Sequence, residues 1–261
     1  MNYLRLFGLY FKVGAMGEMQ YRLNFFVQLF QSVLSLGTAI AGLAVIFAYT
    51  HSLGGWRPEE VLALVGVYTL VGGMIGLVIY PSMEHFIASV RDGSLDFTLV
   101  KPVDAQLLIS VHAVDIWKLM DIGLGIGVLV FALIRLGAQV GPAQVAFFIG
   151  MLLTGSVIIY SFWLILATLS FWFVRVENIL EIFRSMYEAG RWPVSLYPGW
   201  LRFILTFIVP VAFVTTVPAQ ALTGRLTPDT LLIAGVLAVL LFVISRFFWK
   251  IGLRQYSGAS A

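Results

Sequence analysis

Residues 23–50 read LNFFVQLFQSVLSLGTAIAGLAVIFAYT and include no charged side chain. A helix of about 20 apolar residues is long enough to cross the hydrocarbon core of a bilayer. The apolar region of a cleavable signal peptide is shorter, at about 7–15 residues. The stretch therefore predicts a helix that stays in the membrane, and it favours a membrane protein over a soluble domain.

The composition of the whole chain agrees with this interpretation. Of its 261 residues, 60% are hydrophobic and 11% are charged, and the mean hydropathy is +0.96. A soluble domain carries about 25% charged residues. The chain has no cysteine, which excludes disulfides and thiolate metal sites. Its net charge of +3 is thinly spread and does not indicate nucleic-acid binding.

Further apolar stretches predict additional spans. They lie at about 60–80, 115–134, 143–173 and 230–249. Most lysines and arginines fall in loops on one side of these spans, and the positive-inside rule places that side, with both termini, in the cytoplasm. We expect an all-α, polytopic inner-membrane protein of about six spans that forms a single transmembrane permease domain over residues 1–261. Residues 1–22 predict an amphipathic helix on the membrane surface, with a loose tail as the alternative.

The region from residue 177 to 225 allows two interpretations. In the first, 177–195 is a short fifth span and about 198–225 is a re-entrant outer segment. In the second, 177–197 is cytoplasmic and the fifth span covers about 199–217. The positive-inside rule favours the second, because Arg184, Arg191 and Arg202 then remain inside.

The chain lacks the residues that hydrolyse a nucleotide. A phosphate-binding loop has the pattern G-x-x-x-x-G-K-[ST], and Lys12, Lys101, Lys118 and Lys250 all lie outside such a pattern. The three histidines are scattered without metal-ligand spacing. We therefore expect a membrane subunit that is not an enzyme, and any ATP it uses must be bound by another chain.

Residues 81–106, PSMEHFIASVRDGSLDFTLVKPVDAQ, form the longest polar stretch between two predicted spans. Apolar residues recur there at helical spacing up to Val90, and Asp92-Gly93 is typical of a helix end. An amphipathic helix followed by a tight turn suits docking in the groove of a partner protein. An ordinary interfacial loop is the alternative, and the residues alone do not decide between them.

Part of this stretch resembles a signature of the ABC-2 type of export permeases, E-R-E-x-G-T-L-E-x-L-L-x-T-P-V. The matching residues are Arg91, Gly93, Leu95, Leu99, Pro102 and Val103. A second stretch, WPVSLYPGWLR at 192–202, is similar to the outer segment F-P-[LV]-S-x-x-P-x-W-L of the same family. The family's following N-P-L-T-Y is reduced here to Pro210 among apolar residues, which indicates a divergent branch of ABC transporter permeases.

The resemblance implies a function and a set of partners. The chain would be the permease subunit of an ATP-driven ABC exporter, a half-transporter that pairs with a second permease chain, the same or related. Separate ABC ATPase subunits would bind ATP and Mg²⁺, with no cofactor in this chain, and their closure would switch access through the permease. The resemblance also favours the first interpretation of residues 177–225.

In this picture the helix 81–91 is the coupling helix, seated on the ATPase. The residues expected to couple the permease to the ATPase are Glu84, Phe86, Ile87, Val90, Arg91, Gly93, Leu95 and Pro102. The alternative function is a secondary transporter or channel that acts alone. It would need coupling residues of its own, for which Asp115, Lys118 and Asp121 are the candidates, although a structural ion triad is the simpler interpretation.

Two polar stripes run along predicted helices. One consists of Asn24, Gln28, Gln31, Ser35 and Thr38, and the other of Glu177, Glu181, Arg184, Glu188 and Arg191. Polar groups are costly against lipid, so each stripe should face protein or a wet cavity. We take Gln28, Gln31, Glu181, Arg184 and Glu188 as candidate pathway or interface residues, with packing between helices as the alternative for the first stripe and a solvated surface helix for the second. The glycine pairs Gly72/Gly76 and Gly123/Gly127 predict close helix contacts.

Overall fold

The computed structural model describes residues 3–18, 22–137, 140–173 and 177–256. Over this part of the chain the secondary structure is helical, apart from an isolated bridge between Leu53 and Trp56. Five helical stretches are long and apolar enough to cross a membrane: Leu23–Tyr49, Pro58–Arg91, Ile116–Leu136, Pro142–Phe171 and Pro228–Gln255. The predicted all-α, multi-pass architecture is confirmed.

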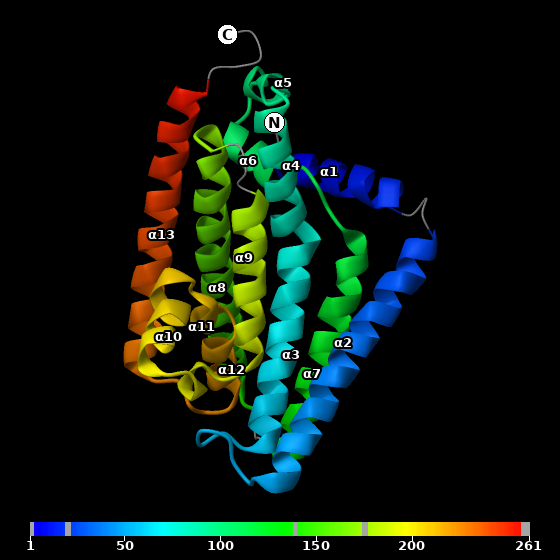
Figure 1. Cartoon of the computed structure of the whole chain (residues 1–261), viewed down its shortest axis with the longest axis vertical. Coiled ribbons are helices and arrows are strands. Elements are labelled where there is room, and N and C mark those ends of the chain that lie inside the picture. The colour runs from blue at the N-terminus through cyan, green and yellow to red at the C-terminus, as the bar shows by residue number, and fades with distance from the viewer. Residues whose placement is uncertain (1–2, 19–21, 138–139, 174–176, 257–261) are drawn as a thin grey trace.

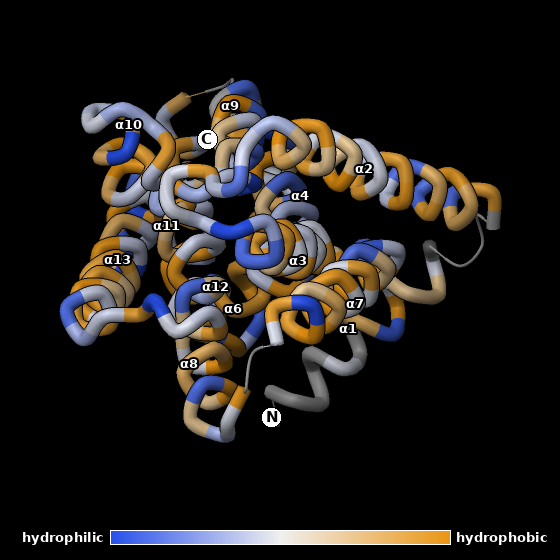
Figure 2. The backbone as a smooth tube through the Cα atoms, turned by 90° about the horizontal axis from the view of Figure 1, so that it is seen from below, coloured by the Kyte–Doolittle hydropathy of each residue, from blue (hydrophilic) through white to orange (hydrophobic). Residues whose placement is uncertain are grey.

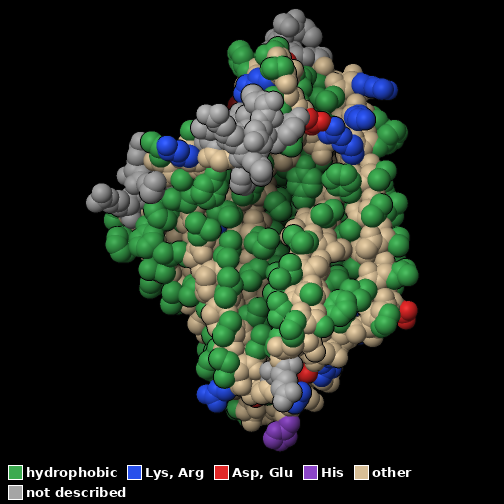
Figure 3. Space-filling view, turned by 180° about the vertical axis from the view of Figure 1, so that it is seen from behind, with side chains coloured by type: hydrophobic (Ala, Val, Ile, Leu, Met, Phe, Trp, Pro, Cys, Tyr) green, Lys and Arg blue, Asp and Glu red, His purple; other side chains and the backbone are tan. Residues whose placement is uncertain are grey.

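The long helices run side by side (Figure 1). They are α2 (Arg22–Tyr49), α3 (Pro58–Met74), α7 (Leu119–Leu136), α8 (Pro142–Thr168) and α13 (Pro228–Gln255). Hydrophobic side chains cover the middle of the molecule, while charged side chains lie mostly toward its two ends (Figure 3). This distribution is that of a protein whose middle faces lipid.

The second span, predicted at about 60–80, does not end before Pro81. The helix runs from α3 through a π-helical turn, Ile75–Ile79, directly into α4 (Tyr80–Arg91). A proline has no N–H, so the carbonyl four residues earlier loses its partner. Here that carbonyl belongs to Leu77, and it accepts a hydrogen bond from the Asp115 N–H at 2.9 Å. The freed group is therefore satisfied from outside the helix, and α3 and α4 form one continuous rod.

This rod packs closely against α7 through glycines. A Cβ added at Gly66 would lie 2.7 Å from the backbone nitrogen of Leu129, and one at Gly125 would lie 2.8 Å from the carbonyl oxygen of Gly66. The prediction for Gly123 and Gly127 is wrong, since a Cβ at either position meets nothing within 4 Å. Gly125 lies between them on a different face of the helix, which the four-residue spacing did not identify.

The region after α8 contains α9 (Glu177–Tyr187) and a bent pair of helical segments. The pair consists of Gly199–Ile208 and Val211–Leu222, which meet at 66° and include α10 (Gly199–Phe203), α11 (Val211–Val214) and α12 (Thr216–Leu222). Figure 1 shows α9 beside α3 and α8, with α10, α11 and α12 gathered at the lower end where α13 begins. This geometry fits a broken span or a re-entrant loop, and the choice between the two remains a prediction.

The upper end of the molecule in Figure 1 carries the short helices α5 (Asp96–Leu99) and α6 (Ala105–Ser110), together with the last turns of α13. The helix α1 (Tyr3–Glu18) crosses the direction of the spans at the same end. Its start and the end of α13 are therefore on the same side. That this side is cytoplasmic, and that α1 lies in the membrane interface, remain predictions.

Candidate functional site

A cleft of about 760 Å³ opens between α2, the α3–α4 rod, the start of α7 and α9. Seen from below, α2 and α9 flank the same side of the rod (Figure 2). Polar side chains from all these elements line the cleft: Asn24, Gln28, Gln31, Ser32, Ser35, Tyr68, Thr69, Tyr80, Glu84, Asp115, Lys118, Asp121, Arg184, Tyr187, Glu188 and Arg191. A polar cleft between membrane-spanning helices needs either water or a polar occupant.

The stripe on α2 forms one wall of this cleft. Gln28 and Gln31, the two candidate pathway residues on this helix, both line it. Thr38, the last member of the stripe, lies outside the lining and instead donates a hydrogen bond to the Ser35 carbonyl at 2.8 Å. Apart from this wall, α2 is largely exposed. Only 6% of its most apolar 18-residue stretch is buried inside the chain.

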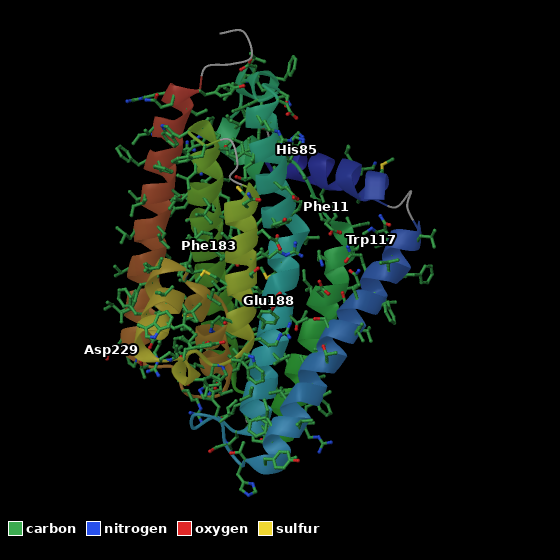
Figure 4. The ribbon with its side chains drawn as sticks, in the orientation of Figure 1. Phe11, His85, Trp117, Phe183, Glu188 and Asp229 are labelled. Carbon is green, nitrogen blue, oxygen red and sulfur yellow. The ribbon has the colours of Figure 1, made fainter. Side chains whose placement is uncertain are left out.

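The stripe on α9 forms the opposite wall. Arg184 and Glu188 line the cleft, whereas Glu181 lies beside it and pairs with Arg184 at 3.8 Å. Figure 4 shows Glu188 on this wall and Trp117 ahead of α7, across the cleft. The structure thus brings together four of the five candidate pathway residues from helices more than 150 positions apart in the chain.

Two arginines, Arg184 of α9 and Arg191 of the 3-10 turn that follows it (Glu188–Arg191), fasten this part of the chain to the rod. The Arg184 guanidinium lies 5.1 Å from the ring centre of Tyr80, and the Arg191 guanidinium lies 5.3 Å from that of Tyr68. Such cation–π contacts contribute about 0.5–2 kcal/mol each. The Tyr187 hydroxyl also donates to the Tyr68 carbonyl at 2.9 Å. The rod and α9 are therefore packed together on the side of the cleft opposite the polar stripe of α2.

The predicted ion triad divides into a pair and a cap. The Lys118 ammonium donates to the Asp121 carboxylate at 3.2 Å, with both side chains largely buried. The Asp115 carboxylate accepts a hydrogen bond from the backbone N–H of Trp117 at 3.1 Å. Asp115 thereby caps the short helical turn that leads into α7. Burial raises the pKa of Asp115. All three groups reach the cleft, and their arrangement fits the structural interpretation.

The apolar face of the predicted coupling helix points into the helix bundle. Phe86 is 1% exposed and Ile87 is 2% exposed. The Phe86 ring packs edge-on against Phe171 and Trp249, at centroid distances of 5.6 and 5.3 Å. Leu95, further along the signature, is also fully buried. The helical spacing was assigned correctly, but these side chains hold the rod against α8 and α13 and leave little for a partner protein to touch.

The exposed apolar residues of the segment lie on α5 and at the residue that follows it. Phe97 is 74% exposed and Val100 is 80% exposed, at the upper end of the molecule (Figure 1). Gly93 adopts φ 73°, the left-handed conformation that ends α4 and turns the chain into α5. Of the other coupling candidates, Glu84, Arg91 and Pro102 are exposed and Val90 is half-buried. We call the segment from Arg91 to Pro102 the tip.

Sequence reasoning missed two ionic sites. Arg246 of α13 pairs with Asp104, and Arg225 pairs with Glu60, in each case joining segments far apart in the chain. A charge inside an otherwise apolar span was an available signal for Arg246. Nothing in the linear sequence joins Glu60 to Arg225.

Two histidines that are distant in sequence come together at the upper end. The rings of His85 and His112 lie 4.0 Å apart between centroids. Burial lowers the pKa of His112, and the nearby His85 and Lys101 lower it further. Within the described residues, no group of three histidine, aspartate or glutamate side chains could hold a metal ion.

Comparison with known protein families identifies a relationship. A family model described as ABC-2 family transporter protein matches residues 33–260. No curated protein and no solved structure matches the chain. The matched range includes the tip, most of α2 and the whole of α9.

Proposed function

Because the chain belongs to the ABC-2 family of transporter proteins, we propose that it is the permease subunit of an ATP-driven exporter of the inner membrane. A separate ATPase would bind ATP and Mg²⁺ and supply the energy. The observation that carries this proposal is the tip, where exposed apolar side chains stand at the end of a helical rod that also forms the base of the cleft.

The tip has the character of a docking surface for another protein. Phe97 and Val100 present apolar area to solvent beside the charged side chains of Arg91, Asp92 and Lys101, all of them exposed. An apolar centre with a polar rim is typical of protein interfaces. In the family the partner at this position is the ATPase, so we assign the tip, rather than Phe86 and Ile87, as the contact with the ATPase.

The continuous rod gives a physical route from the tip to the cleft. Tyr68, Tyr80 and Glu84 lie on the rod and line the cleft. Since α9 is fastened to the same rod, a displacement of the tip would move this wall and base together against α2. A rigid helix that changes its contacts as a unit is a common element of switching transporters.

A second permease chain would complete the pathway. The cleft is open at one side, and α2 leaves most of its surface uncovered within this chain. We propose that a second copy or a related chain faces this side, so that Gln28, Gln31, Arg184 and Glu188 line a route between the two chains. Glu181, beside the cleft, would belong to the contact between chains.

Co-purification from the native membrane tests the proposal. The intact chain, extracted in mild detergent, should bring with it a nucleotide-binding ATPase subunit, and the reconstituted complex should hydrolyse ATP. A lone oligomer of this chain that transports in vesicles without an ATPase would overturn the proposal and support the secondary transporter or channel.

A further inference from the structure

The final span reaches the coupling region through Arg246. Its guanidinium forms a two-pronged ion pair with the Asp104 carboxylate and also donates to the Gln106 side-chain oxygen at 2.5 Å. Asp104 is the cap of α6, where its carboxylate accepts the Leu107 N–H at 3.2 Å. One arginine of α13 therefore holds the first turn of the helix that follows the tip.

A chain of hydrogen bonds continues from Gln106 into α8. The Gln106 side-chain nitrogen donates to the Tyr160 hydroxyl at 3.2 Å. The Tyr160 hydroxyl lies 2.7 Å from the Ser110 hydroxyl, which in turn donates to the Gln106 carbonyl at 2.6 Å. Since Ser110 uses its only proton on that carbonyl, Tyr160 donates to Ser110. Each donor in this series of hydrogen bonds then has one acceptor. Gln106, which lies at the centre of the series, is 5% exposed.

Two further contacts join α13 to the same region. Trp249 packs against Phe86 of α4, and the Tyr256 hydroxyl donates to the Gly93 carbonyl at 3.3 Å. The upper part of α13 thus contacts α4, the turn before α5, and α6, which are the three elements that support the tip. Of these contacts, only the one through Arg246 extends by hydrogen bonds into α8.

We propose that Arg246 is a positioning residue that transmits displacement of the tip to α13 and α8. A two-pronged arginine–carboxylate pair fixes orientation as well as distance, so α6 cannot rotate or slide without moving the arginine. The helices α13 and α8 would then move with the tip. This movement would add to that of the rod, which displaces the base of the cleft. This inference rests on the proposed function, because it requires an ATPase that displaces the tip.

A distance measurement in the reconstituted permease–ATPase complex tests the inference. The chain contains no cysteine, so two introduced cysteines can carry spin labels without interference. Suitable sites are the exposed Leu240 on α13 and Val33 on α2. We expect ATP to change the distance between these labels in the otherwise unaltered chain, and Arg246→Gln to reduce that change by about 5-fold or more.

The controls separate transmission from folding and docking. Arg254→Gln, at an exposed arginine near the end of the same helix, should leave the ATP-dependent change intact. Asp104→Asn is the second variant, because asparagine still caps α6 while it removes the ionic partner of Arg246. Both Arg246→Gln and Asp104→Asn should retain the co-purified ATPase and its ATP hydrolysis.

The outcomes are distinct. A full ATP-dependent change in Arg246→Gln or Asp104→Asn, beside a responsive parent chain, overturns the role of Arg246 and leaves the proposed function standing. A parent chain that retains no ATPase overturns the proposed function and this inference together, whereas a parent chain that retains its ATPase but whose label distance does not respond to ATP overturns this inference alone.

Discussion

Glu60 and Arg225 lie 165 positions apart in the chain and form a two-pronged ion pair, with distances of 3.0 and 2.7 Å between the guanidinium nitrogens and the carboxylate oxygens. Glu60 is 2% exposed and also accepts the Arg57 N–H at 2.7 Å. Arg225 donates to the Gly55 carbonyl at 2.7 Å and lies over the Trp56 ring. These contacts fasten the first turn of α3 and the loop before it to the loop before α13, so they close the lower end of the bundle.

Removal of one partner of this pair should destabilise the protein strongly. Glu60→Ala removes the carboxylate that accepts from Arg225 and from the Arg57 N–H. Arg225 is 36% exposed and keeps the Gly55 carbonyl as an acceptor, so we expect a cost of about 1–3 kcal/mol. We expect a large drop in the thermal unfolding temperature of the detergent-solubilised protein. Glu59→Ala, at the neighbouring and less buried acid, is the matched control. Equal stability of the two variants would show that the pair contributes little.

The glycine contact between the rod and α7 predicts that valine is destabilising at Gly125 but tolerated at Gly123, two positions earlier. Gly125→Val places methyl groups against the backbone of Leu70 and Gly66, where even a Cβ would lie 2.7 Å from the Leu70 Cα. Overpacking of this kind costs about 1–3 kcal/mol or more. Gly123→Val meets open space and should be tolerated. Thermal unfolding and yield after purification measure both variants, and a fully stable Gly125→Val would contradict the close packing.

Substitution by aspartate should have different effects at two phenylalanines of the coupling region, on docking at one and on folding at the other. Phe97→Asp changes an exposed side chain, so stability should stay within about 0.5 kcal/mol, while stimulation of the partner ATPase is lost. Phe86→Asp buries an unpaired carboxylate among Phe171 and Trp249, and we expect little folded protein. ATPase activity and size-exclusion profiles of the reconstituted complexes distinguish the two. Normal ATPase stimulation in Phe97→Asp would exclude the tip as the docking surface.

The fold followed from the sequence wherever a long apolar run decided it. The run at 23–50 and the later apolar stretches each became a helix, because backbone groups in lipid must pair within their own segment. The largest departure from the predicted bounds is the end of the second span, which continues from about residue 80 to Arg91. The predicted end of the second span before Pro81 is wrong, because the rule that proline ends a helix considers one chain segment alone. Its freed acceptor, the Leu77 carbonyl, is satisfied by the N–H of Asp115, and no local pattern contains that partner.

The cleft was predicted in part. The spacing of Gln28 and Gln31 on one helix, and of Arg184 and Glu188 on another, correctly assigned each pair to one face. That the two faces meet across one cleft depends on packing between helices, which spacing does not encode. The same limit explains Phe86, since an amphipathic helix has an apolar face whether it packs on its own chain or on a partner.

The pair between Asp104 and Arg246 should respond to acid. The hydrogen bonds from Arg246 hold the pKa of Asp104 below its usual value of about 3.9. A carboxyl with a lowered pKa stabilises the fold fully above its usual pKa and loses that contribution as the pH falls through the lowered value. Both side chains are 38% exposed, so the contribution should be about 1 kcal/mol or less.

We expect Asp104→Asn to unfold at a lower temperature than the unaltered protein at neutral pH. This gap in unfolding temperature should narrow as the pH falls below about 4. The same comparison in an Arg246→Gln background, where the ionic partner of residue 104 is absent, is the control. Thermal unfolding in detergent across this pH range measures the effect, and a gap that stays constant into acid would mean that the carboxylate at residue 104 gains nothing from Arg246.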